Sequence, residues 1–371
     1  MYPKVILIDI IPHQTTPEES LARLNELENL ITTYGGFVVI RKIQKRQMPD
    51  YQTYIGKGKV QEILDEALEL KAEYIIVNNL LKPRQIYNLE TVFEKHNIKV
   101  WDRVDLILKI FSKHATTREA KLQIELASLR HLGPRISKMG LELTRQGGGG
   151  SGGGGARRGQ GETNIEVMKR HIASREDKIK QELKKVENLY ENQRSRRISE
   201  GFKTVAIVGY TNAGKSCLLR ALTGKDVKVK NELFATLDSR IGKLFLPDKN
   251  TCCLVSDTIG FIRDLPPTLI HAFHSTLAET INADLLLHVI DTSDFEMEWK
   301  IKTVHDVLKE LDCENKKMIY VFNKTDLLDN KYLDRMKNEI DKMKNEYAPV
   351  FVSAEKKINL DELKSIISKN I

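Results

Sequence analysis

The chain has 371 residues, of which 41% are hydrophobic and 30% are charged, so it is long enough for two or three domains with a sizeable core. It contains no run of about 18 apolar residues, which argues against proteins anchored by a membrane-spanning helix. Its first residues lead into a strand-like segment rather than a signal peptide. We therefore expect a cytoplasmic protein with no integral membrane segment, and peripheral association with a membrane stays open.

The formal net charge of +8 comes entirely from the middle of the chain. Residues 1–100 carry 13 basic and 13 acidic residues, and residues 201–371 carry 25 of each. Residues 101–200 carry 21 basic and 13 acidic residues. A positive excess on one segment indicates an element that faces a polyanion, although a solvated helical face would give the same count.

Residues 1–114 alternate short apolar segments with helical patterns. Strands alternating with helices of this length form parallel sheets, so the sequence predicts a small N-terminal parallel α/β domain. The strands are predicted over residues 5–10, 36–40, 74–77 and 98–101, and the helices over residues 17–33, 59–70 and 83–95.

Residues 115–200 are predicted to form an antiparallel helical hairpin. Apolar residues with helix-compatible spacing extend to about Pro134, and a second such pattern runs from about Thr163 to Ser199. Between the two patterns lies a glycine-rich loop, residues 146–161, in which two runs of four glycines flank Ser151. A loop between two long paired helices forms the tip of a hairpin.

This tip loop has two interpretations. Arg145, Arg157 and Arg158 flank the glycines, and arginine pairs with phosphates and stacks on bases while glycine allows close backbone approach. We therefore predict that the three arginines bind RNA. The glycine run at 147–155 also resembles an engineered flexible linker, and that interpretation stays open.

The segment Gly209–Ser216 reads GYTNAGKS and matches the phosphate-loop pattern G-x-x-x-x-G-K-[ST]. It follows an apolar run, residues 205–208, and leads into a helical segment, so strand, turn and helix stand in the required order. Lys215 is predicted to reach the β- and γ-phosphates, and the hydroxyl of Ser216 is predicted to bind Mg²⁺. A chance glycine turn would lack these flanking elements.

Two further segments are predicted to sense the γ-phosphate. Thr236, in the loop segment 234–238, is the candidate whose hydroxyl completes the Mg²⁺ shell, which makes this segment switch I. Asp257 follows an apolar strand and is placed to hold Mg²⁺ through a water molecule, and the N–H of Gly260 can contact the γ-phosphate. Lys215, Thr236 and Gly260 are therefore the predicted catalytic residues.

The segment Asn323–Asp326 reads NKTD and decides which base is bound. The carboxylate of Asp326 can accept two hydrogen bonds from guanine, and adenine offers no such donor pair, so we expect GTP and GDP to be selected over ATP. A backbone N–H of Ser353-Ala354 is expected to bind the carbonyl oxygen of guanine. Each motif follows a predicted strand, as ligand-binding residues of open α/β sheets do. The predicted nucleotide-binding residues are Gly209, Tyr210, Thr211, Asn212, Ala213, Gly214, Lys215, Ser216, Cys217, Phe234, Ala235, Thr236, Asp257, Thr258, Ile259, Gly260, Asn323, Lys324, Asp326, Ser353 and Ala354.

The residue after Gly260 is Phe261, whereas Ras-type enzymes carry a glutamine there that orients the attacking water. An apolar ring cannot align water, so we expect slow intrinsic hydrolysis that depends on a partner or on another segment. Outside these motifs, His288 lies in an apolar strand and is expected to be a hydrogen-bonded core residue. The cluster Asp102–Asp105 is expected to start a helix.

Together these motifs resemble the HflX family of translational GTPases. The resemblance extends from about Val5 to Ile371, and one departure is Cys217, where the family usually has threonine. The glycine runs of the tip loop are also richer than the usual family pattern. The segments that carry the resemblance are residues 209–216, 257–262, 118–127 and 158–163, with residues 56–59 and 82–85 in the N-terminal domain.

The resemblance implies an α/β fold, with an N-terminal parallel α/β domain plus an antiparallel helical hairpin, followed by a Ras-like P-loop GTPase domain at residues 201–371. It also implies a GTPase that binds the large (50S) ribosomal subunit and its RNA, and that splits or rescues stalled 70S ribosomes under stress. We expect a monomer. A GTPase acting in large-subunit assembly, or a nucleotide-gated binding protein with negligible turnover, are the alternatives.

Overall fold

The computed structural model describes two compact units, Met1–Lys113 with Lys121–Leu183, and His114–Ala120 with Lys184–Ile371. The described residues are 2–146, 156–225, 233–234, 240–264, 266, 269, 277–342 and 349–371, and the side chains of 137–146, 156–165, 193, 198, 339 and 341–342 are not among them. The predicted hairpin, residues 115–200, is divided between these two units, and its predicted boundaries stay a prediction. Every helix in the described part of the chain is too short or too polar to cross a lipid bilayer.

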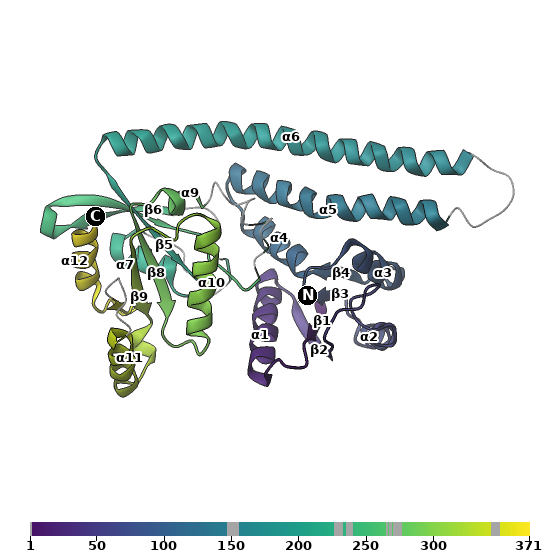
Figure 1. Ribbon diagram of the computed structural model, residues 1–371, viewed down its shortest axis with the longest axis horizontal. Coiled ribbons are helices and arrows are strands. Elements are labelled where there is room, and N and C mark those ends of the chain that lie inside the picture. Colours follow the sequence, from purple (N-terminus) through teal and green to yellow (C-terminus); the bar gives the residue numbers. More distant parts are fainter. Residues whose placement is uncertain are drawn as a thin grey trace. The chain divides into compact units, whose positions relative to one another are not determined.

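The first unit is built on a parallel four-stranded sheet (Figure 1). Its strands are β1 (Lys4–Ile11), β2 (Phe37–Lys45), β3 (Tyr74–Val77) and β4 (Lys99–Asp102), in the order β2-β1-β3-β4. The helices are α1 (Pro17–Tyr34), α2 (Lys57–Leu70), α3 (Pro83–Phe93), the 3₁₀ turn η1 (Glu94–His96) and α4 (Arg103–His114). The predicted N-terminal parallel α/β fold is therefore confirmed.

Local signals in the sequence explain where these elements begin and end. Thr16 caps α1 and accepts a hydrogen bond of 3.2 Å from the N–H of Glu19 in a capping box, and Gly35 ends the same helix with φ +98°. The apolar faces of the sheet, α2 and α3 then bury a shared core that includes Ile6, Ile75 and Phe93. Burial of this kind is the main free-energy gain of folding.

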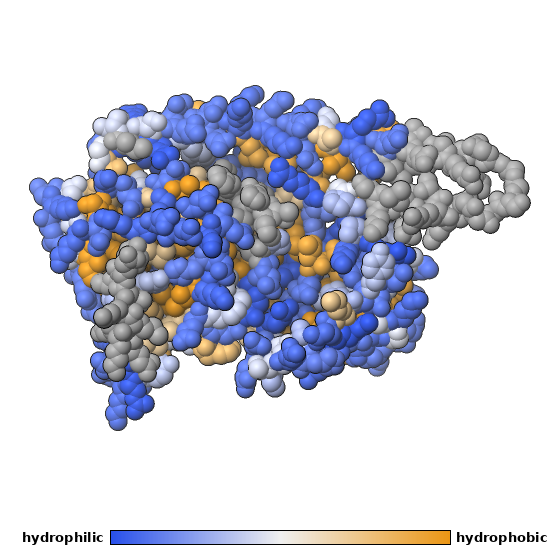
Figure 2. Space-filling model, in the orientation of Figure 1, coloured by the Kyte–Doolittle hydropathy of each residue, from blue (hydrophilic) through white to orange (hydrophobic). Residues whose placement is uncertain are grey.

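The hairpin consists of α5 (Arg118–Gln146) and α6 (Ala156–Ser199). Leu122 and Leu126 of α5 pack with Ile179 of α6, which is fully buried, so the antiparallel pairing is confirmed. In Figure 2 the described part of α6 is predominantly hydrophilic, as expected for a helix with few apolar contacts. The pairing is reinforced by Arg175, which donates hydrogen bonds of 2.6 and 2.8 Å to Glu125.

The helix boundaries differ from the sequence prediction in two places. Helix α5 continues through Pro134 to Gln146, so the proline does not end it. Helix α6 begins at Ala156, so residues 156–161 are helical rather than part of the predicted tip loop. Alanine, arginine and glutamine are good helix formers and outweigh two single glycines there. The glycine run at 147–155 lies outside the described residues.

The second unit is built on a six-stranded sheet in the order β10-β9-β8-β5-β7-β6, in which only β6 runs antiparallel to its neighbour. Its strands are β5 (Lys203–Gly209), β6 (Arg240–Leu246), β7 (Thr251–Asp257), β8 (Leu285–Asp291), β9 (Met318–Asn323) and β10 (Val350–Phe351). Its helices are α7 (Lys215–Thr223), α9 (Ala278–Asn282), α10 (Met297–Glu310), α11 (Asn330–Lys342) and α12 (Leu360–Asn370), with 3₁₀ turns η2 (Pro247–Lys249) and η3 (Thr325–Leu327). Helices cover both faces of this sheet, the arrangement of a P-loop GTPase domain (Figure 1).

Candidate functional site

The phosphate loop joins β5 to α7 and depends on two glycines with positive φ. Gly209 has φ +152°, and a Cβ on it would lie 2.4 Å from the carbonyl oxygen of Val289. Gly214 has φ +97°, and a Cβ on it would lie 2.2 Å from Nδ2 of Asn323. Only glycine tolerates such approaches, so the strand–turn–helix geometry follows from the glycine spacing of the motif.

Lys215 lies over the loop at the start of α7. Its Nζ donates hydrogen bonds to the carbonyl oxygens of Gly209 at 3.1 Å and of Tyr210 at 2.7 Å. Burial lowers the pKa of Lys215 to about 8, and the charge of Asp257 acts in the opposite direction. The ammonium is therefore mostly protonated at neutral pH and is available to a phosphate group beside the loop.

Two of the three residues predicted to hold Mg²⁺, Ser216 and Asp257, come together from two elements. The hydroxyl of Ser216, in the first turn of α7, donates a hydrogen bond of 2.5 Å to Oδ2 of Asp257 at the end of β7. Asp257 is fully buried. Mg²⁺ prefers hydroxyl, carboxylate and water oxygens, so this donor set fits the ion. Thr258, the next residue, is anchored through its hydroxyl to the carbonyl of Ile207 at 2.7 Å.

Only part of the predicted switch I lies within the described residues. Ala235 and Thr236 lie outside them, so the predicted Mg²⁺ and γ-phosphate contacts of Thr236 stay predictions. Phe234 is buried, has φ +57°, and its carbonyl oxygen accepts a hydrogen bond of 3.1 Å from Nδ1 of His114. The sequence patterns did not indicate this contact between switch I and the residue that ends α4.

Residues 257–261, which are called switch II below, lie directly against the phosphate loop. A Cβ on Gly260 would lie 2.7 Å from Cγ2 of Thr211 and 2.9 Å from Nζ of Lys215. Phe261 is 1% exposed, and its carbonyl oxygen accepts a hydrogen bond of 2.8 Å from the N–H of Thr211. The ring of Phe261 therefore fills the core, where it cannot orient water.

The base-recognition residues converge from three strand ends. Asn323 donates a hydrogen bond of 2.9 Å to the carbonyl of Ala213 and accepts one of 3.0 Å from the N–H of Ala354. Its amide therefore links the phosphate loop to the loop after β10. Asp326 accepts a hydrogen bond of 2.5 Å from the hydroxyl of Ser353, which orients the carboxylate predicted to bind guanine.

Two residues near the nucleotide site were not among the predicted site residues. Asp291, at the end of β8, forms an ion pair of 2.6 Å with Nζ of Lys324. Glu355 forms an ion pair of 3.7 Å with Arg220 and lies 3.4 Å from Sγ of Cys217. Asp291 could have been found from its place at a strand's carboxyl end, where such sites gather, whereas Glu355 had no comparable signal.

Comparison with known proteins identifies the family of this chain. Family models match residues 21–112 (GTP-binding GTPase N-terminal), 114–197 (GTP-binding GTPase Middle Region) and 204–324 (50S ribosome-binding GTPase). The GTPase HflX of Caldanaerobacter subterraneus subsp. tengcongensis is 43% identical over 368 residues, which is 99% of this chain and 80% of that protein. This chain belongs to the HflX family of GTPases.

Two further comparisons agree with the family. The GTPase HflX of Escherichia coli K12 is 39% identical over 317 residues, covering 85% of this chain and 72% of that protein. The crystal structure of SsGBP with GDP matches 100% of this chain and 98% of its own, at 25% identity and a TM-score of 0.55. The HflX chain described here is therefore a GTPase, which hydrolyses GTP to GDP and phosphate, and GTPases of this kind generally use Mg²⁺ with the nucleotide.

The predicted RNA-binding arginines of this HflX chain lie on the two hairpin helices. Arg145 is in the last turn of α5, and Arg157 and Arg158 are in the first turn of α6. Their side chains lie outside the described residues, so RNA binding by them stays a prediction.

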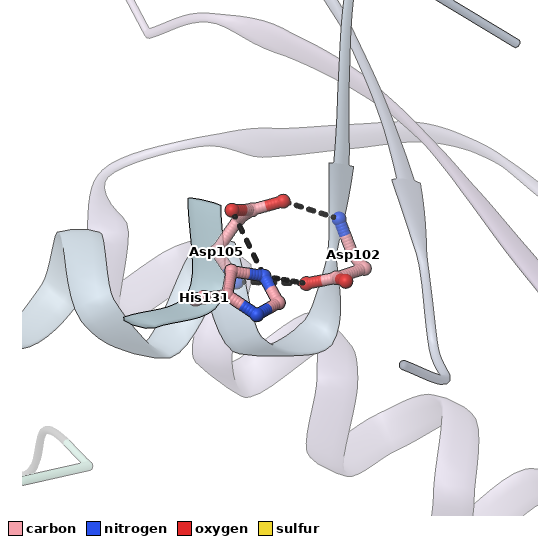
Figure 3. Close-up of side chains that lie close together, drawn as sticks. All are labelled: Asp102, Asp105 and His131. Atoms are coloured by element: carbon pink, nitrogen blue, oxygen red, sulfur yellow. Dashed lines mark hydrogen bonds and ion pairs between the residues drawn. The ribbon is translucent and has the colours of Figure 1, made fainter. Parts of the chain in front are cut away.

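A second polar cluster, in the first unit, contains Asp102, Asp105 and His131 (Figure 3). Their carboxylate oxygen and imidazole nitrogen atoms, which could bind a metal ion, lie within 4.8 Å of one another. The guanidinium of Arg135 lies 2.8 Å from Asp102 and 2.9 Å from Asp105. Because this guanidinium already supplies the positive charge, the cluster is an ion network that joins α5 to β4 and α4. Asp102 and Asp105 also cap each other's backbone N–H groups, so the predicted helix start is confirmed.

His288 lies in β8 and is 1% exposed, as predicted for a core residue. However, its Nδ1 has no hydrogen-bond partner among the described residues. The prediction that His288 is hydrogen-bonded is therefore wrong for this nitrogen. Burial and the neighbouring His305 lower its pKa to about 3, which keeps the ring neutral. The described cysteines Cys217, Cys252, Cys253 and Cys313 are free thiols.

Proposed function

We propose that this HflX GTPase binds the large ribosomal subunit and, with GTP bound, splits or rescues stalled 70S ribosomes. The observation that carries the proposal is the buried ring of Phe261, which stands where Ras-type enzymes orient water. A partner that completes the site is therefore needed for rapid turnover. The description of the matched family model, a 50S ribosome-binding GTPase, supports the ribosome as that partner.

The roles proposed for the site residues follow from the contacts above. Lys215 and the backbone N–H groups of the phosphate loop bind the phosphates, while Asp326 and the loop after β10 bind guanine. Ser216, Thr236 and, through water, Asp257 hold Mg²⁺, which when bound neutralises charge on the phosphates. Thr236 and the N–H of Gly260 sense the γ-phosphate. The buried hydroxyl of Thr211, which has no hydrogen-bond partner among the described residues, supports a polar ligand at the loop.

The hairpin is proposed to make the RNA contact. Residues 101–200 carry the whole excess of positive charge, and Arg145, Arg157 and Arg158 stand beside the hairpin tip. We propose that the tip contacts ribosomal RNA of the large subunit near the peptidyl transferase centre. The protein would then act as a cytoplasmic monomer.

Steady-state GTP hydrolysis with and without purified 50S subunits and 70S ribosomes tests this function, with subunit separation followed by light scattering in the same sample. We expect strong stimulation of hydrolysis and a GTP-dependent fall in scattering. Lys215→Ala is the control, because it should abolish GTP binding and both signals. Unchanged turnover at saturating ribosomes would contradict the proposal, and stimulation by 50S subunits without splitting would favour a role in large-subunit assembly.

A further inference from the structure

We propose that Arg263 is a positioning residue for GTP hydrolysis, which holds switch II against the phosphate loop through contacts with Tyr210, Glu296 and Trp299. These four residues are called the Arg263 latch below. The inference concerns the GTPase reaction itself and does not depend on the ribosome as partner.

Switch II is held to the phosphate loop by its backbone. Next to the bond from Thr211 to the carbonyl of Phe261, the N–H of Phe261 donates to the carbonyl oxygen of Gly209 at 3.2 Å. These two bonds form a short parallel bridge immediately after Gly260. The position of the Gly260 N–H is therefore set by how firmly the following residues are held.

Arg263, two residues after Phe261, fixes this segment in place. Its backbone N–H donates a hydrogen bond of 2.6 Å to the hydroxyl of Tyr210, which belongs to the phosphate loop. Its guanidinium donates to Glu296 at 2.7 Å and lies 3.9 Å from the ring centroid of Trp299. Arg263 is 6% exposed, and a buried arginine is retained only with such partners.

Two side-chain partners of Arg263 lie at the start of helix α10. Glu296 occupies the N-cap position of α10, and Trp299 lies in the first turn of that helix. Trp299 also meets the ring of Tyr210 edge-on, with centroids 6.2 Å apart, and Nζ of Lys300 lies 5.0 Å from the Tyr210 ring. The latch thus ties switch II to the phosphate loop and to α10 at once, using both an ion pair and a cation–π contact.

Loss of the Arg263 latch should affect hydrolysis of GTP and binding of GDP differently. Positioning errors of about 1 Å are enough to slow an enzyme by about 10²-fold, and the latch limits the positions open to Gly260. The Gly260 N–H is proposed to contact the γ-phosphate, which GDP lacks. Loosening the latch should therefore slow hydrolysis of GTP while the loop and the base-recognition residues still bind GDP normally. An ion pair that merely stabilised the fold would affect both nucleotides together.

The test uses the full chain with Arg263→Ala, Arg263→Lys and Glu296→Gln, and Lys302→Ala, an exposed cation on the same helix, as the matched control. Single-turnover hydrolysis of GTP and the Kd of GDP are measured for each. We expect Arg263→Ala to reduce the rate by about 10-fold or more with the Kd of GDP unchanged within about twofold. Arg263→Lys should fall in between, because lysine keeps the charge but not the planar fork. Lys302→Ala should match the parent chain.

A spectroscopic signal completes the test, because the chain has only two tryptophans. In a Trp101→Phe background, the emission of Trp299 should differ between GDP and a non-hydrolysable GTP analogue, and Arg263→Ala should abolish that difference. Equal hydrolysis rates in the variants and the parent, or parallel losses for GTP and GDP, would overturn the inference. If Arg263→Ala does not fold, Glu296→Gln, which keeps the size of the partner and removes its charge, decides between the same outcomes.

Discussion

The side-chain amide of Asn323 donates a hydrogen bond of 2.9 Å to the carbonyl of Ala213. In this position the amide fills the space that a side chain on Gly214 would need. The base-recognition loop and the phosphate loop are therefore packed directly on each other. The first prediction follows from this contact.

Gly214→Ala should abolish binding of GTP and GDP. The new Cβ would lie 2.2 Å from Nδ2 of Asn323, and the backbone has φ +97°, which alanine adopts only with strain. Gly58→Ala is the matched control, because Gly58 lies in α2 with no atom within 4 Å of its Cβ position. The control should bind nucleotide normally and gain about 0.5 kcal/mol or more in free energy of unfolding. Fluorescent GDP titration and urea denaturation measure the two effects, and normal GDP binding by Gly214→Ala would contradict the packing.

Asp326→Asn should shift base preference from guanine towards xanthine nucleotides. The substitution exchanges an acceptor for a donor, and the Ser353 hydroxyl, which donates to Oδ1 of Asp326, would still hold the side chain in place. Competition between GDP and XDP for the variant measures the shift. A preference for guanine equal to that of the parent chain would refute the base-recognition role of Asp326.

Phe261→Gln should not create rapid intrinsic hydrolysis. The side chain at this position is buried, and both the N–H and the carbonyl of Phe261 are bonded to the phosphate loop, so a glutamine there points into the core rather than to the nucleotide. Burying its amide without partners should lower the free energy of unfolding by on the order of 2 kcal/mol. Single-turnover hydrolysis and urea denaturation check both statements, and a rate gain of about 100-fold would show that the position can orient water after all.

The free energy of unfolding should fall at alkaline pH because of the ion network formed by Asp102, Asp105, His131 and Arg135. Burial alone lowers the pKa of His131, but hydrogen bonds to Asp102 and Asp105 outweigh it and raise the pKa from 6.5 to about 9. The charged ring thus stabilises the fold fully below about pH 6.5, and that contribution, on the order of 2 kcal/mol, is lost as the pH rises through 9. Urea denaturation at pH 6, 7.5 and 9.5 should show the loss. The same series on His131→Gln should be flatter, and identical slopes for the two proteins would rule His131 out as the source.

Replacing Arg157 and Arg158 with alanine should weaken ribosome binding and flatten its salt dependence. Each lost phosphate contact should reduce the slope of log K against log salt by about 0.7 to 0.9. Filter binding to 50S subunits at several salt concentrations measures this slope. Lys169→Ala with Arg170→Ala, an equal loss of charge further along α6, is the control and should change the slope less.

Several structural features could be read from local sequence because they depend on neighbouring residues. The phosphate loop needs glycine at Gly209 and Gly214, and both have positive φ in the structure. The strands of the first sheet follow short apolar runs that alternate with helical patterns, and α1 begins at a capping box formed by Thr16 and Glu19. The sequence does not show where α5 ends, because a proline favours a helix end, whereas the helix continues through Pro134 to Gln146 and Arg135 is held by Asp102 and Asp105.

The amino-acid sequence by itself determined that this chain is a guanine-nucleotide enzyme of the HflX family, because each motif holds its chemistry within a few consecutive residues. Only the tertiary structure decided how those motifs are held in place. Arg263 and Glu296 are 33 residues apart, as are Asp102 and Arg135, and neither pair forms a periodic pattern. Such contacts depend on which strand ends and helix faces the fold brings together, and that information lies in the packing of the whole chain rather than in any one segment.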